Sequence, residues 1–482
     1  MLKIKEFTVE RLHDVFTYNL QIPVRGEDDF AIFYGDNGSG KTTLEKLLFH
    51  ILSAAPNKGH LHRIAAVPFR SIKVVLSDET VVSAVRDGPV TSYPVIFSIK
   101  RPSEKAIIYF FAPERTRARL IAERVEVAVA ENKASAKFNA KFPERISARK
   151  DSMVYRHAYE SLASSFSEAR HKSYIDGLAD LGIRPYFLGT DRRVLSDSIE
   201  PWAYSSIHKS KEDEEEEISK LRAQYLKDAM ERSANYLRRQ IIRAANTGSK
   251  NTNDIYAEIF KRISKQNTDI DSKDGEGFRS LLAELYLLQR RHRPFVALGL
   301  MPAINIQSVL PKSRKIIGAS QIILKELLVP YVATLRARLD AMEPIRRSIE
   351  TFIRGLNLFF SYKYIEYIPP GGFRITGPND VELNVEQLSS GEQQLLLIFC
   401  LILSASDSSS LFIIDEPEIS LNVKWQRNLI DSINDIRGAS NNQMIIATHS
   451  IELLTQHSER VVELDPIVAR NSTPVYETEQ ED

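Results

Sequence analysis

The 482-residue chain contains only one cysteine, Cys400, and has no apolar run long enough to cross a bilayer. A single cysteine cannot form an intrachain disulfide, which fits a reducing compartment. The apolar run around it, residues 395–403, is far shorter than the roughly 20 residues that a spanning helix needs. The N-terminal residues alternate apolar and charged side chains and lack the apolar block of a signal peptide. We therefore expect a cytoplasmic protein with no membrane partner and with Cys400 in its core.

The sequence also lacks an excess of charge of either sign. Its 64 basic residues nearly cancel its 63 acidic ones, so the net charge is +1. Any contact with nucleic acid must therefore come from a local patch and not from bulk charge. A chain of this length and average composition can bury a sizeable core, and we expect more than one lobe.

A glycine-rich turn joins a predicted strand to a predicted helix in the segment FAIFYGDNGSGKTTLEKLLF. It fits the pattern GxxxxGK[ST] in the strand, loop and helix context that the pattern requires. The glycines allow backbone N–H groups to surround phosphates, the lysine reaches the outer phosphates, and the threonine hydroxyl can hold Mg²⁺. We predict a phosphate site formed by Gly35, Asn37, Gly38, Gly40, Lys41, Thr42 and Thr43.

Two further predicted strands end in polar side chains. The segment LFIIDEPE runs into Asp415 and Glu416, and QMIIATHS ends in Thr448 and His449. We predict that Asp415 binds Mg²⁺ together with Thr42, directly or through water, and that Glu416 orients and deprotonates an attacking water. His449 is then the second catalytic candidate, as a contact to the terminal phosphate.

A small-residue turn, LSSGEQQ at residues 388–394, opens the apolar segment LLLIFCLIL. The start of a helix leaves backbone N–H groups without partners and carries the positive end of the helix dipole, so an anion is expected there. The sequence therefore predicts a second part of the nucleotide site at Ser389, Ser390, Gly391 and Glu392.

In their order along the chain, GDNGSGKTT, LSSGEQQ, LFIIDEPE and THS resemble the ATP-binding head of the ABC ATPases. The resemblance implies an α/β fold, in which a P-loop ABC ATPase head with a mixed sheet and flanking helices carries a large α-helical insertion. It also implies that ATP is bound with Mg²⁺ and is hydrolysed in composite sites of a head-to-head dimer. In such a dimer Ser389 and Gly391 would touch the γ-phosphate bound at Lys41 of a second copy.

Within the ABC ATPases, the stretch DEPEISLNVKWQ at residues 415–426 resembles the OLD, RecF and Rad50 group. Members close to OLD show SLHP after the acids, whereas this chain has SLNV at residues 420–423. The glutamine loop of the family is a second departure, because no glutamine occurs from residue 44 until Gln224. Either Gln224 and its neighbours or another residue fills that role.

Two aromatic residues, Phe16 and Tyr18, shortly precede the phosphate loop. An aromatic ring at this place can stack on the adenine base. The alternative is a core strand with an edge tyrosine.

The motifs divide the chain into parts. Residues 71–100 show short apolar runs separated by turn signals, which predict hairpins, and 363–377 predicts another hairpin with PPGG as its turn. Composition predicts helices in 101–185. We expect an N-terminal head lobe over 1–100, a helical insertion over 101–185, a return strand of the head over 186–210, a helical arm over 211–362 and a C-terminal head lobe over 363–482.

The predicted arm combines an apolar seam with flanking arginines. Apolar residues recur at steps of three and four, which is typical of a helix packed on a neighbour: Leu328, Val332, Leu335, Leu339, Met342, Ile345, Ile349 and Phe352. The arginines are Arg336, Arg338, Arg346, Arg347 and Arg354, with RRHR at 290–293. They either grip nucleic acid or a protein partner or only solvate the helix flank. We expect the arm to serve dimerisation or to hold another protein.

The chain resembles stand-alone OLD-like ATPases of bacterial anti-phage systems, such as the ATPase subunit of PARIS and, second, that of Septu. OLD nucleases carry a Toprim domain after the head, and little sequence follows His449 here, so we expect a separate effector nuclease. The resemblance implies a sensor and scaffold, dimeric or in a larger assembly such as a hexamer, that releases or activates the effector when it detects a phage protein or nucleic acid. The alternative is a RecF-like or Rad50-like ATP-dependent DNA-binding protein of DNA repair or maintenance.

Overall fold

The computed structural model describes most of the chain in two compact units. The first unit contains Met1–Ile207, Ser406–Arg427 and Ala439–Asp482, and the second contains His208–Ala405 and Asn428–Gly438. The described residues are 2–24, 29–36, 38–86, 94–112, 167–190, 194–197, 220, 222–246, 275–303, 319–405, 410–438 and 442–468.

A largely parallel sheet of six strands carries the predicted phosphate and metal motifs of the first unit. Its order is β14 (Val461–Glu463), β3 (Phe30–Tyr34), β13 (Gln443–Thr448), β12 (Ser410–Asp415), β8 (Arg184–Leu188) and β9 (Val194–Ser196). All neighbours pair in parallel except β9, which is antiparallel to β8. Every residue of the central β13 is buried, as expected for a strand covered on both faces. The parallel pairing places the ends of β3, β13 and β12 at one edge.

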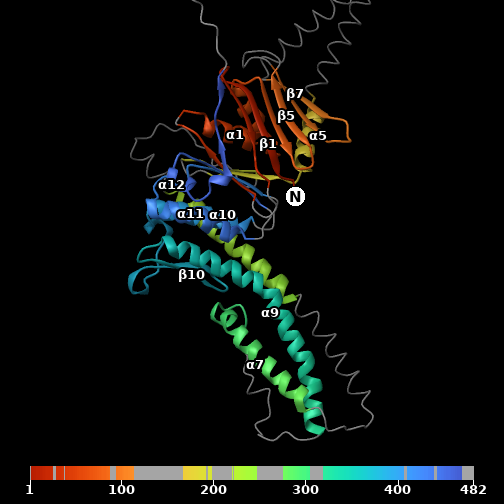
Figure 1. The fold of residues 1–482 in the computed structure, drawn as a ribbon, viewed down its shortest axis with the longest axis vertical. Helices are drawn as coiled ribbons and strands as arrows, with labels where there is room; N and C mark the ends of the chain where they lie inside the picture. Colours follow the sequence, from red (N-terminus) through yellow and green to blue (C-terminus); the bar gives the residue numbers. More distant parts are fainter. Residues whose placement is uncertain are drawn as a thin grey trace, which may run out of the picture. The chain divides into compact units, whose positions relative to one another are not determined.

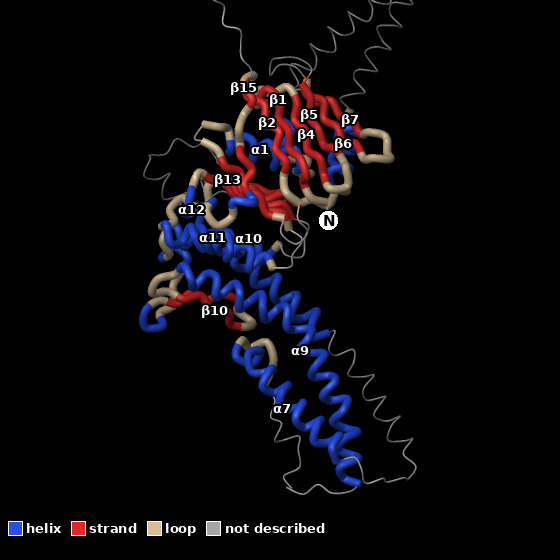
Figure 2. The backbone as a smooth tube through the Cα atoms, in the orientation of Figure 1, coloured by secondary structure: helices blue, strands red, loops and turns tan. Residues whose placement is uncertain are grey.

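An antiparallel sheet of seven strands forms the second layer of this unit (Figure 2). Its order is β15 (Ile467–Val468), β2 (Phe16–Gln21), β1 (Ile4–Leu12), β4 (Ser71–Leu76), β5 (Val81–Arg86), β6 (Val95–Lys100) and β7 (Ile107–Phe111). The hairpins predicted within residues 71–100 are confirmed by the β4–β5 and β5–β6 pairings. The helical prediction is wrong for β7, because its backbone completes the ladder with β6.

Helix α1 (Lys41–Leu52) lies between the two sheets and contacts β8, β12 and β13 of one and β5 of the other (Figure 1). Its apolar side chains join those of both sheets in one buried cluster. Two more helices of this unit, α2 (His60–Ala66) and α5 (Glu168–Ala179), pack on α1 and on β6 and β7 respectively. This packing fixes the start of α1, which is where the glycine-rich loop ends.

The second unit consists mainly of helices. It contains a helix over 222–246, α7 (Gly275–Ala297), α9 (Ala319–Phe359), α10 (Ser390–Ser404), most of α11 (Val423–Arg437) and the hairpin of β10 (Tyr364–Ile368) and β11 (Gly372–Thr376). The hairpin predicted for 363–377 is therefore confirmed, and Cys400 is buried in α10 as expected. Of the helices that the structure describes, none combines the length and the apolar character needed to span a membrane.

Helix α9 packs along the seam that the sequence predicts. All eight predicted seam residues are at most 8% exposed, and the buried stripe continues to Leu356 and Phe359. The stripe faces α7 and α10, and Figure 1 shows α7 lying alongside α9. Near α10 the contact is close, because a Cβ added at Gly355 would lie 3.1 Å from Cε2 of Phe399.

Most of the arm arginines pair with acids of the same unit. Arg336 pairs with Glu284 and Arg291 with Asp340, which joins α9 to α7. The other described ion pairs of this group are Arg291 with Glu343, Arg346 with Glu343 and Glu350, Arg347 with Glu343, and Arg354 with Asp435. Hydrogen bonds from Arg346 lower the pKa of Glu343 to about 2. Most of these pairs have an exposed partner, and exposed pairs contribute only about 0–1 kcal/mol each. The pairing favours the solvated-flank interpretation over a phosphate-binding patch.

Removing a seam side chain should destabilise the second unit. Leu339 is fully buried, so Leu339→Ala is expected to lower the free energy of unfolding by about 2–5 kcal/mol. Leu358 lies on the same helix with 53% of its surface exposed, so Leu358→Ala should change the free energy of unfolding by less than about 0.5 kcal/mol. Denaturant unfolding followed by circular dichroism measures both, and equal effects would contradict the seam.

Candidate functional site

The glycine-rich loop has the backbone that a phosphate cradle requires. Gly38 and Gly40 have φ angles of 86° and 79°, a left-handed conformation that favours glycine. Gly35 has no room for a side chain, because an added Cβ would lie 2.9 Å from Oγ of Ser39. Lys41 is 6% exposed, and its ammonium donates to the carbonyls of Gly35 at 2.8 Å and Asp36 at 3.0 Å. The lysine therefore already lies over the loop. Asn37 falls outside the described residues.

The first residues of α1 meet the end of β12. The Thr42 hydroxyl donates to Oδ2 of Asp415 at 2.6 Å. Asp415 is 1% exposed, and its other oxygen, Oδ1, has no hydrogen-bond partner in the described part of the chain. Burial raises the pKa of this carboxyl. A buried carboxylate oxygen without a donor suits a cation, and Mg²⁺ prefers oxygen ligands of this kind.

No described group of three or more His, Cys, Asp or Glu side chains forms a complete metal cage. Mg²⁺ in phosphate-binding sites commonly takes one or two protein oxygens and completes its shell with water and phosphate oxygens. Thr42 and Asp415 therefore fit the metal that the P-loop pattern implies.

Glu416 and His449 lie together at the same edge of the sheet. Nδ1 of His449 is 3.3 Å from Oε1 of Glu416. Glu416 has a φ angle of 48°, a conformation that costs a non-glycine residue of the order of 1–3 kcal/mol. Its N–H donates to the carbonyl of Ala447 at 2.9 Å, which ties it to β13. The carboxylate is thus held partly exposed beside the imidazole.

Two buried glutamates of this edge were not predicted from the sequence. Glu418 accepts hydrogen bonds from the Thr448 hydroxyl at 2.5 Å and from the His449 N–H at 3.3 Å, so it fixes the turn after β13. Glu45 is fully buried one turn after Lys41, and burial, followed by the neighbouring Asp415, raises its pKa well above the usual range. The signal for Glu45 was an acid on the apolar face of the segment LEKLLF.

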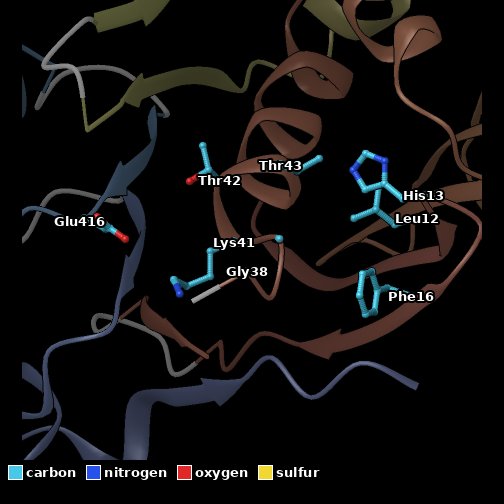
Figure 3. A pocket seen from close by; sticks show the side chains of 9 residues that line it. Leu12, His13, Phe16, Gly38, Lys41, Thr42, Thr43 and Glu416 are labelled. Carbon is cyan, nitrogen blue, oxygen red and sulfur yellow. The ribbon is translucent and has the colours of Figure 1, made fainter. Parts of the chain in front are cut away.

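A pocket of about 350 Å³ opens beside the loop (Figure 3). Lys41, Thr42 and Glu416 lie toward one end of it, and an apolar and aromatic group lies toward the other. Its lining consists of Leu12, His13, Phe16, Gly38, Gly40, Lys41, Thr42, Thr43 and Glu416. The volume falls within the range of about 300–1,000 Å³ typical of small-ligand sites.

The two aromatic residues considered for base stacking, Phe16 and Tyr18, have different positions in the structure. Phe16 lines the pocket, whereas Tyr18 is fully buried and its hydroxyl donates to the carbonyl of Ser39. For Tyr18 the core-strand alternative therefore holds, because its buried ring packs in the strand and its hydroxyl supports the loop. Sequence reasoning missed Leu12, the last residue of β1, and His13, which lies in the turn between β1 and β2.

The small-residue turn caps its own helix. Ser389 is the N-cap of α10, where its Oγ accepts from the Glu392 N–H at 3.4 Å and its own N–H donates to the Glu392 carboxylate at 2.7 Å. The expectation of bare N–H groups is thus only partly correct. Within the described residues, the backbone N–H groups of Ser390 and Gly391 have no acceptor. Lys363 also contacts Glu392, with Nζ 2.7 Å from Oε2.

The structure describes the surroundings of Asn422 and Gln224, the residues at the two departures noted in the sequence. Asn422 caps α11, because its side-chain oxygen accepts from the Trp425 N–H at 2.9 Å. Asparagine is a favoured N-cap, so SLNV starts a helix where the related proteins have SLHP. Gln224 lies in the second unit and donates to Asp228 of its own helix at 2.8 Å.

The predicted site residues divide between the two units. The first unit brings together Gly38, Gly40, Lys41, Thr42, Thr43, Asp415, Glu416 and His449, with Gly35 at the start of the loop. Ser389, Ser390, Gly391 and Glu392 belong to the second unit.

Comparison with known proteins places this site in a family. Residues 203–455, more than half of the chain, match the family described as "AAA domain, putative AbiEii toxin, Type IV TA system". The matched range contains the small-residue turn, Asp415, Glu416 and His449. Over 170 residues, or 35% of this chain, the sequence is 27% identical to the zinc import ATP-binding protein ZnuC of Vibrio parahaemolyticus. The chain spans 59% of the length of that relative.

Solved SMC head domains are also similar to this chain. One, from Pyrococcus furiosus with an extended coiled coil and bound to the C-terminal domain of ScpA, is 11% identical with a TM-score of 0.36, covering 97% of this chain and 96% of its own. The SMC head domain from Thermotoga maritima is 9% identical with a TM-score of 0.29, covering 98% and 100%. The fold assignment rests on the strand order and the loop geometry and not on these scores.

The contact between Thr42 and Asp415 predicts a specific metal dependence. Thr42→Val should raise the Mg²⁺ concentration needed for half-maximal ATP binding by at least about tenfold, because the variant lacks one oxygen ligand. Thr455→Val is the matched control, since the Thr455 hydroxyl lies outside the loop and donates to the carbonyl of Glu452, and it should leave the Mg²⁺ requirement unchanged. Titration of a fluorescent ATP analogue at several Mg²⁺ concentrations measures this, and an unchanged requirement in Thr42→Val would contradict the assignment.

Proposed function

The chain belongs to the family of AAA domains described as putative AbiEii toxins of type IV toxin–antitoxin systems, and it is an ATP-binding P-loop ATPase of the ABC type. From this premise we propose that it hydrolyses ATP between the heads of a dimer. The observation that carries the proposal is the convergence of Lys41, Thr42, Asp415, Glu416 and His449 at the ends of neighbouring strands and at the start of α1.

Each of these residues has a role that its surroundings support. The N–H groups of the glycine loop and the Lys41 ammonium bind the outer phosphates. Thr42 and Asp415 hold Mg²⁺, which supplies charge neutralisation at the phosphate oxygens. Glu416 orients a water molecule and accepts its proton as the water oxygen attacks the terminal phosphorus. His449, 3.3 Å from Glu416, donates to the terminal phosphate. The products are ADP and phosphate.

The second half of the site comes from another copy of the chain. In this proposal the exposed Ser389 and Ser390, with Gly391, face the γ-phosphate that is bound at Lys41 of the second copy. The unpartnered N–H groups at the start of α10 support it. A helix start stabilises an anion by about 0.3–1 kcal/mol when exposed and up to roughly 2 kcal/mol when partly buried. Two such contacts per dimer favour ATP over ADP by tens-fold to hundreds-fold, which is enough for a switch.

The proposed biological role is that of a sensor and scaffold in bacterial anti-phage defence. The family description, which names a toxin–antitoxin system, supports this role. The ATPase subunit of PARIS is the first candidate relative and that of Septu the second. In this role the dimer, or a hexamer or other larger assembly, holds a separate effector nuclease through its helical arm and releases or activates it when a phage protein or nucleic acid is detected.

The assigned catalytic base gives a direct test of turnover. Glu416→Gln should lower ATP turnover by roughly 10²–10⁴-fold, because an amide cannot accept the proton, while ATP binding persists. Glu452→Gln is the matched control on the same unit, since Glu452 is an exposed partner of Arg427, and it should remain within about twofold of the parent. Phosphate release and equilibrium ATP binding are the two measurements. Normal turnover in Glu416→Gln would remove Glu416 from this role.

Co-purification tests the biological role. The tagged chain, expressed with its genomic neighbours, should bring down a nuclease-like protein in fixed ratio on an even-numbered assembly when Glu416→Gln traps ATP. Lys41→Ala, which should not bind ATP, is the control. Recovery of DNA alone, strengthened by ATP and weakened by salt, would instead favour the RecF-like or Rad50-like alternative. The paired arginines of the arm count against direct DNA contact there.

A further inference from the structure

A lysine from the start of the β10 hairpin reaches the first turn of α10. Nζ of Lys363 lies 2.7 Å from Oε2 of Glu392, the same oxygen that accepts the Ser389 N–H. The Glu392 side chain is 5% exposed and the Lys363 side chain 22%. The Glu392 carboxylate of this pair is therefore largely removed from solvent.

The backbone around Lys363 is built to place it. The side chain of Asn357 in α9 binds both backbone polar groups of Ile365. Its oxygen accepts from the Ile365 N–H at 2.8 Å, and its amide nitrogen donates to the Ile365 carbonyl at 3.1 Å. Tyr362 turns the chain with a left-handed φ of 59°. These contacts fix the reversal between α9 and β10, so Lys363 is positioned by the fold and is not a freely moving surface lysine.

Lys363 compensates the charge of the buried Glu392 carboxylate, which would be costly without a partner. A carboxylate in the first turn of a helix is favourable, because it caps an N–H group and faces the positive end of the dipole. A lysine at the same place faces that positive end and is mildly unfavourable. The ion pair has a further consequence when a third charged group approaches the start of α10, because the charge of Glu392 then acts on that group.

That third group follows from the proposed function, on which this inference rests. If the γ-phosphate of ATP bound to a second copy docks at Ser390 and Gly391, it approaches a helix start that carries the negative charge of Glu392. Like charges at short range repel, and partial burial strengthens the repulsion. An uncompensated Glu392 would therefore oppose the contact that this turn is proposed to make.

We propose that Lys363 is a positioning residue for ATP-dependent association: its ammonium cancels the charge of Glu392 and holds the carboxylate in its capping position. The N–H groups of Ser390 and Gly391 then remain open to the phosphate of the second copy. With the lysine in this position, the Glu392 carboxylate can cap its own helix without repelling the triphosphate of the second copy.

The test uses the full-length Glu416→Gln chain as parent, so that bound ATP is not consumed. Its ATP-dependent dimer dissociation constant is measured by sedimentation, and ATP affinity of the monomer is measured separately. Lys363→Met should weaken association at least tenfold and leave ATP affinity of the monomer within about twofold. Lys227→Met is the matched control, because Lys227 forms an exposed ion pair with Glu386 in the same unit, and it should have no effect on association.

Charge compensation separates this role from simple support of the fold. Lys363→Met combined with Glu392→Gln should restore association to within about threefold of the parent, and Lys363→Arg should retain most of it. An unchanged dimer in Lys363→Met, or no recovery in the double variant, overturns the inference while the composite site stands. A parent that does not associate with ATP at all overturns both the composite site and the inference.

Discussion

The parallel pairing of β3, β13 and β12 is the constraint on which the site depends. Its register places Thr448 beside Tyr34 and Asp415 beside Ala447, so all three strands end at one level. The glycine loop follows β3, the acids follow β12 and the imidazole follows β13. A shift in the register of β12 against β13 would move Asp415 away from Thr42 and Glu416 away from His449. Much of the buried apolar surface of the first unit, including α1 between the sheets, serves to hold that register.

The same edge concentrates carboxyl groups that water would normally solvate. Asp415, Glu45 and Glu418 are all nearly inaccessible, and burial raises the pKa of each. A buried ionised carboxyl is costly unless hydrogen bonds or a cation compensate it. Glu418 is compensated by Thr448 and His449, and Asp415 only in part by Thr42. A protonated Glu45 also shares a hydrogen bond with Asp415, so a divalent cation at Asp415 would compensate the charge that remains on this pair.

Much of this arrangement was predictable from the sequence, because its signals are local. The glycine pattern requires left-handed backbone at Gly38 and Gly40, and a spacing of three and four residues places the seam of α9 on one face. The local signals were insufficient where a partner in the fold decides. β7 is a strand because β6 offers it a ladder, and Tyr18 is a support because the Ser39 carbonyl lies above its hydroxyl. The Ser39 carbonyl is distant from Tyr18 in sequence, and so are the partners of Glu45 and Lys363.

The start of α10 shows how one turn can serve two purposes. A helix has more N–H groups in its first turn than one side chain can satisfy. Ser389 and Glu392 satisfy two N–H groups and stabilise the helix, while those of Ser390 and Gly391 have no acceptor among the described residues. Because the helix does not need these N–H groups for its own stability, a ligand can accept hydrogen bonds from them without unfolding the turn. The cost of bringing an anion there is then set mainly by the charge on Glu392, and Lys363 lies where it can cancel that charge.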